Sequence, residues 1–199
     1  VNLTDVTFEV GRYLGASHYF EGSLFDLRIY DETLTQAQIR ELLNNPAQTV
    51  PTGLTSADLI HRYLFETDAN DTGATGDNLT MTNSPLFTLE KARLPRGLDL
   101  VHDASFARSA MGSSVEFDGS ADYLQADNYT KGSSTAITVS FWMNSGLDLS
   151  SAKTICNNQG GGAGSVDQFI VRTFSGSLDV QFHDSTQRSV NLATTTAGF

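Results

Sequence analysis

The stretch GSLFDLRIYDETLTQAQI, residues 22–39, changes its hydrophobic period near its midpoint. In its first half the apolar residues alternate, which predicts a strand with Phe25, Leu27 and Ile29 on one face. In its second half they return at helical spacing, so a short helix capped by Thr35 is expected to follow. The stretch therefore predicts a core strand that leads into one short surface helix.

The rest of the chain continues the strand pattern, with glycine, asparagine and aspartate between most of the apolar runs. Short runs of this kind, separated by turn residues, are typical of antiparallel sheets. We therefore expect two antiparallel sheets, with strands over residues 4–13, 22–30, 59–65, 114–117, 123–126, 136–143, 153–156, 168–174, 177–183 and 188–192. Residues 83–111 contain few such runs and are expected to be mostly irregular.

The composition excludes several classes of partner. The 199 residues include 12 Lys and Arg against 23 Asp and Glu, a formal net charge of −11. A surface this acidic repels nucleic acid and anionic lipid, so neither is an expected partner. No apolar run approaches the ~18 residues of a membrane span, and no membrane insertion is expected. A single cysteine, Cys156, excludes an internal disulfide and is expected to be a small buried residue.

Four segments resemble the laminin-G-like and pentraxin-like jelly rolls. Residues 22–39 resemble the closing strand and short helix of that family, and residues 59–73 resemble its opening. Residues 115–124 and 137–143 resemble the two strands that follow the opening. The resemblance implies an all-β fold, a concanavalin-A-like jelly-roll sandwich of two antiparallel sheets with one short helix.

The closing motif precedes the opening motif in this chain. Residues 1–46 correspond to the closing strands and helix of one unit, residues 47–57 to a linker, and residues 58–199 to the opening and central strands of a unit. Two alternatives fit this order, a circularly permuted domain and a window cut from a tandem array. Because the family's first and last strands are neighbours, the permuted domain predicts that residues 22–30 pair antiparallel with residues 59–65.

The resemblance also implies a strand and hairpin that the chain lacks. Their absence leaves a sheet edge open, and an open edge tends to pair with another strand. We therefore expect neighbouring repeats or other subunits among the partners, supplying strands from outside the domain.

The loop after residue 65 is dense in oxygen ligands. Calcium takes about six to eight oxygens, and a turn rich in Asp, Asn and Gly can supply them. The family often holds structural calcium beside this loop, so the resemblance implies a Ca²⁺ site. The predicted ligands are Asp68, Asn70, Asp71 and Asp77. The alternative is a solvated turn held by the hydrogen bonds of its own Asp and Asn side chains.

Aromatic residues near loops are the candidates for ligand binding. Glycan sites combine exposed rings with a few polar groups, and Tyr19, Tyr123 and Tyr129 are the predicted ligand-binding residues. The acids within residues 66–71 match the spacing of a laminarinase-type catalytic strand only formally, because Thr, Ala and Asn stand where a strand needs apolar anchors. No catalytic function is therefore expected.

Together these features predict a non-catalytic binding or adhesion module, extracellular or on a cell or virion surface. Its loops would present a glycan or a cell-surface protein. The alternative is a structural repeat of a fibre, sheath or virion appendage with no small ligand. The fold alone does not decide between the two.

Overall fold

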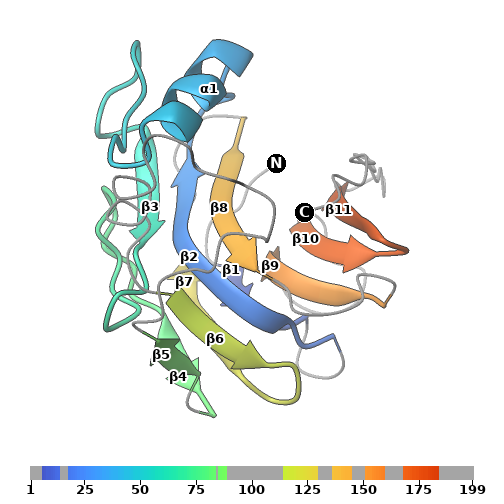
Figure 1. The fold of residues 1–199 in the computed structure, drawn as a ribbon. Helices are drawn as coiled ribbons and strands as arrows, with labels where there is room; N and C mark the ends of the chain where they lie inside the picture. The colour runs from blue at the N-terminus through green and yellow to red at the C-terminus, as the bar shows by residue number, and fades with distance from the viewer. Residues whose placement is uncertain are drawn as a thin grey trace, which may run out of the picture.

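The structure is a computed structural model that describes residues 6–13, 18–83, 85–88, 114–129, 136–144, 151–159 and 168–183. These residues form two antiparallel sheets and one helix (Figure 1). Side chains from both sheets meet in one apolar core. The predicted all-β sandwich with one short helix is therefore confirmed, and its jelly-roll order stays an expectation.

Six strands make the first sheet, here called sheet A, in the order β11-β10-β9-β1-β7-β4. Their bounds are Ser177–His183 for β11, Gln168–Phe174 for β10, Lys153–Gln159 for β9, Val6–Val10 for β1, Tyr123–Tyr129 for β7 and Thr80–Thr82 for β4. The first strand of the chain thus lies in the middle of the sheet, between two strands that come much later in sequence.

The second sheet, sheet B, is built around β2. Its strands are β2 (Glu21–Tyr30), β3 (Leu59–Tyr63), β5 (Leu86–Thr88), β6 (Ser114–Asp118) and β8 (Thr138–Asn144). One edge of β2 pairs with β8, and the other pairs with β6 and then β3, with β5 beyond β6. In the antiparallel pair of β2 and β3, Leu27 lies opposite Tyr63 and Ile29 opposite His61. The predicted pairing of residues 22–30 with residues 59–65 is confirmed.

A β-bulge in β2 changes which side chains reach the core. The register of β2 against β8 shifts after Phe25, and Asp26 has a left-handed backbone with φ of 47°. A bulge shifts by one residue which side chains point to the core. Leu27 and Ile29 therefore face the core, and Phe25 does not. The prediction that Phe25 shares their face is wrong. Its ring instead stacks on Trp142 on the outer face of sheet B, with centroids 6.0 Å apart.

The core joins the beginning of the chain to its later strands. Phe8 of β1 is fully buried, and its ring centroid lies 6.3 Å from that of Tyr63 and 6.1 Å from that of Phe169. Residues 1–46 thus supply a central strand to each sheet, and the strands of residues 58–199 lie on both sides of them. A single permuted domain predicts this interleaving of strands. The division into a closing unit (residues 1–46), a linker (47–57) and an opening unit (58–199) stays a prediction.

The helix α1 (Gln36–Asn44) begins after Thr35, whose side chain accepts a hydrogen bond in a capping box, as the sequence predicts. The connection from α1 to β3 then folds back on sheet B, where the Tyr30 hydroxyl donates to the Thr49 carbonyl at 2.7 Å. Residues 47–57 therefore pack against the sandwich. No helix among the described residues is long and apolar enough to cross a membrane.

Most of the other predicted strands are present with shifted ends. Residues 188–192 lie outside the described residues. The sequence does not predict β4 and β5, because three residues give too little alternation to recognise. β5 lies in residues 83–111, which were expected to be mostly irregular.

Candidate ligand-binding face

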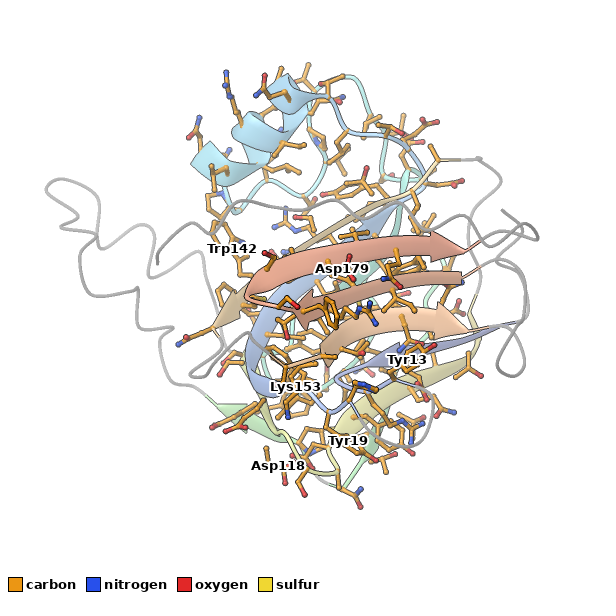
Figure 2. All side chains as sticks on the ribbon, turned by 90° about the vertical axis from the view of Figure 1, so that its right-hand side faces the viewer. Tyr13, Tyr19, Asp118, Trp142, Lys153 and Asp179 are labelled. Carbon is orange, nitrogen blue, oxygen red and sulfur yellow. The ribbon has the colours of Figure 1, made fainter. Side chains whose placement is uncertain are left out.

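The outer face of sheet A, toward the viewer in Figure 2, carries a row of mostly polar side chains that runs from β4 to β11. The strand registers place in this row Thr80, Gln125, Glu9, Asn157, Ile170 and Gln181. All but the isoleucine can donate or accept hydrogen bonds. Since neighbouring strands lie ~4.8 Å apart, the row is about 24 Å long.

Five residues around the middle of this row form what we call the polar cluster: Glu9, Arg12, Tyr123, Gln125 and Asn157. The Arg12 guanidinium lies 3.3 Å above the Tyr123 ring, forms an ion pair with Glu9 and approaches Gln125 Oε1 at 3.4 Å. Asn157 Nδ2 donates to the Arg12 carbonyl at 2.6 Å. Burial alone would lower the pKa of Arg12, but the hydrogen bond and charge of Glu9 outweigh it and the pKa is raised. The cluster therefore holds a charged guanidinium against an aromatic ring.

The backbone at Gly11 places Arg12 over the sheet. Gly11 has φ of +87°, which L side chains rarely adopt, and a Cβ there would lie 2.4 Å from Phe117 Cε1. Its amide donates to the Ile155 carbonyl at 2.7 Å directly after the end of β1. Only glycine fits this turn, so the position of Arg12 is fixed by its neighbour in sequence.

Two atoms of the polar cluster are buried without a hydrogen-bond partner among the described residues, Arg12 Nε and Asn157 Oδ1. Asn157 is 0% exposed and Glu9 only 5%, although both belong to the outer face of the sheet. An unsatisfied buried polar atom costs about 1–3 kcal/mol and is rare in native proteins. The described residues therefore leave one donor and one acceptor inside the cluster unsatisfied.

A second arginine–aromatic pair lies on the same face toward the β11 edge. The Arg172 guanidinium lies 4.9 Å from the centroid of the Phe174 ring, and Arg172 Nε donates to Asp179 at 2.8 Å. Phe174 is 47% exposed. The face thus presents two rings, each beside an arginine that is paired with a carboxylate.

The three predicted ligand-binding tyrosines lie at different distances from the polar cluster. Tyr123 is part of it. Tyr19, which is labelled in Figure 2, forms a β-bridge with Thr154 of β9. Thr154 lies about 10 Å along that strand from Asn157. Tyr129 ends β7, about 20 Å from Tyr123 along the strand. The structure therefore places Tyr123 in the polar cluster, Tyr19 beside Thr154 of β9 and Tyr129 at the far end of β7.

Sequence reasoning did not identify the four other members of the cluster. Glu9 and Gln125 alternate with apolar residues in predicted strands, and this alternation could have indicated that their side chains point outward. Asn157 lies just beyond the predicted end of its strand, and Arg12 reaches the face only through the Gly11 turn. The latter two positions depend on the backbone, so alternation alone could not find them.

Among the predicted calcium ligands, Asp71 has the densest contacts. Its side chain is fully buried and accepts hydrogen bonds from His61 Nδ1 at 2.7 Å, Thr75 Oγ1 at 3.2 Å and the amides of Arg62, Gly73 and Asp77 at 2.7–3.0 Å. Burial alone would raise the pKa of this carboxyl, but the His61 hydrogen bond and the Arg62 and Gly73 amides outweigh it and lower the pKa. Asp71 is thus a carboxylate that holds the loop to β3.

The side chains of the other predicted ligands do not converge on Asp71. Asp68 accepts from the amide and the side chain of Asn70 in an exposed turn, while the main chain of Asp77 donates to Asp71 and accepts from the Tyr63 hydroxyl. Among the described residues, no three His, Cys, Asp or Glu side chains are grouped to hold a metal ion. These contacts match the hydrogen-bonded turn, the alternative to a calcium site, and calcium binding stays a prediction.

No family model, curated protein or solved structure matches this chain. The resemblance to laminin-G-like jelly rolls therefore stays an expectation that depends on the motifs alone.

Proposed function

We propose that this protein is a non-catalytic binding module that holds a glycan on the outer face of sheet A. The observation that carries the proposal is the Arg12 guanidinium over the half-buried Tyr123 ring, beside the half-buried side chain of Gln125. A sugar hydroxyl can accept from a guanidinium N–H and can donate to a side-chain amide oxygen such as that of Gln125. Aromatic rings beside such groups supply the apolar surface that a sugar ring covers.

The charges of the face favour a neutral glycan. Arg12 is paired with Glu9 and Arg172 with Asp179, so neither arginine offers an uncompensated positive charge. The chain as a whole has a net charge of −11, which repels acidic polysaccharides. A glycan ligand is in keeping with the extracellular, cell-surface or virion-surface position that the sequence predicts, and this location is part of the proposal.

We expect Tyr123→Ala to weaken the affinity for a neutral oligosaccharide at least about tenfold, which corresponds to about 1.4 kcal/mol. Gln125→Ala is expected to weaken it less, because a net hydrogen bond is worth about 1 kcal/mol. The measurement is a screen of immobilised neutral and acidic glycans, followed by calorimetric titration of the best ligand.

Trp142→Ala is the matched control, since it removes an aromatic side chain from the outer face of the other sheet. It should leave the affinity unchanged, provided that thermal unfolding shows all three variants folded. Glycan binding that survives Tyr123→Ala and disappears in Trp142→Ala would place the site on sheet B and refute the proposal.

A further inference from the structure

The edges of the two sheets differ in how well they are protected. β4 and β5 are three-residue strands, and short edge strands template little pairing. The outer edge of β3 is covered by its own loop, because the amides of Thr72, Ala74 and Thr75 donate to carbonyls of β3 at 2.8–3.2 Å. β11, in turn, includes the charged Asp179, and Leu178 and Gln181 have further partners. Each of these edges carries a feature that limits pairing with another chain.

β8 is the exception among the described edges. It has seven residues, TVSFWMN, with no charged residue and no proline. Among the described strands it pairs only with β2. An edge strand of this length without charge or proline, and with no described strand on its outer side, is the kind that natural proteins avoid unless it is paired.

The core beneath β8 is also incompletely covered. Ile137, Val139, Phe141 and Met143 pack against the main core, yet they are only partly buried, while the core residues of neighbouring β2 are fully buried. A strand added beside β8 would cover these apolar side chains and also pair the backbone groups of the edge.

We propose that β8 pairs antiparallel with β8 of a second copy of this chain, about a two-fold axis at Phe141. In this register Val139 faces Met143 of the second copy, and Phe141 faces its own counterpart, so apolar core-facing residues meet apolar ones. On the other face Ser140 meets Trp142 and Thr138 meets Asn144. The strand is therefore complementary to itself residue by residue.

Charge limits where a second copy of this acidic chain could bind. Two chains of net charge −11 repel one another, and like charges directly opposite each other destabilise a strand pair. β8 contributes no charge to the contact, so two copies meet there with less repulsion than at a charged edge such as β11. The same two-fold contact closes on itself, which predicts a dimer and not a filament.

Two register-specific variants test the proposal by analytical ultracentrifugation. Val139→Glu and Met143→Lys each place two unpaired charges at apolar positions of the dimer, and each should weaken dimerisation by about a hundredfold or more. An equimolar mixture should restore a dimer, because the new Glu then faces the new Lys while the wild-type Met143 and Val139 meet at the symmetry-related position. Thr80→Lys, which adds a charge to the edge strand of the other sheet, is the control and should remain dimeric.

A wild-type chain that stays monomeric at submillimolar concentration would overturn the proposal, and so would a dimer that both β8 variants retain. If the variants fail to fold, backbone hydrogen exchange of the wild type replaces them. Protection of the β8 amides should then increase with protein concentration, and protection that does not change contradicts the pairing.

Discussion

Asp71→Ala is expected to lower the free energy of unfolding by about 3–5 kcal/mol. The substitution removes the acceptor of five hydrogen-bond donors, including His61, which is itself fully buried. Each buried donor that loses its acceptor costs about 1–3 kcal/mol, although these costs do not add fully. Urea unfolding at neutral pH measures the difference.

Asp68→Ala is the control, because Asp68 lies in the same loop and is exposed. Its effect should stay within about 0.5 kcal/mol. The two variants also separate the hydrogen-bonded loop from a calcium site. If millimolar Ca²⁺ raises the wild-type unfolding midpoint and both variants abolish that increase, the loop binds calcium as the sequence predicted, and the hydrogen bonds are not its main support.

The contribution of Asp71 should also depend on pH. The pKa of Asp71 is lowered in the folded state, so its stabilisation is complete above the unfolded pKa of about 3.9 and is lost as the pH falls through the folded value. The stabilities of wild type and Asp71→Ala should therefore converge in acid. A constant difference down to the acid limit would show that the charge of Asp71 is not what stabilises the loop.

Phe8→Ala is expected to cost about 3–5 kcal/mol as well, since it leaves a cavity at a fully buried aromatic position. Phe8 contacts the rings of Tyr63 and Phe169, so the loss should destabilise both sheets together in one cooperative transition. Thermal and urea unfolding, followed by near-UV circular dichroism and by tryptophan fluorescence from Trp142 in sheet B, measure the effect.

Thr7→Ala on the same strand is the control and should cost less than about 1 kcal/mol, because Thr7 is only half buried. If Phe8→Ala costs no more than this control, the first strand does not belong to the core. The tandem-array alternative would then be favoured, with the first 46 residues completing a different unit.

Much of the fold follows from local pattern, and the exceptions have physical causes. Alternation found β2 and β3, and the permuted-domain alternative predicted that they pair. The face of Phe25 could not be predicted, because a single left-handed residue, Asp26, reverses the parity of the strand after it. Such a bulge depends on the partner strand and leaves no period in the sequence.

The candidate sites divide in the same way. Tyr123 was predicted from its residue type, whereas Arg12 and Asn157 reach the polar cluster through backbone contacts between segments far apart in the chain. Asp71 was predicted as one of four calcium ligands, but its five hydrogen-bond donors come from β3 and from its own loop, which only the folded structure brings together. Oxygen-rich composition by itself does not distinguish a metal site from a carboxylate satisfied by hydrogen bonds.

The most direct test of the proposed function is a nuclear magnetic resonance titration with the best neutral glycan. The side-chain amide groups of Gln125 and Asn157 have their own resonances and lie in the polar cluster. Asn45 caps the end of α1, and Gln48 follows in the connection that packs on β2, so their side-chain amides serve as internal controls. We predict that saturating glycan shifts the Gln125 and Asn157 resonances and leaves those of Asn45 and Gln48 in place. Shifts confined to Asn45 and Gln48, or no shift at Gln125 and Asn157 at saturation, would contradict the account.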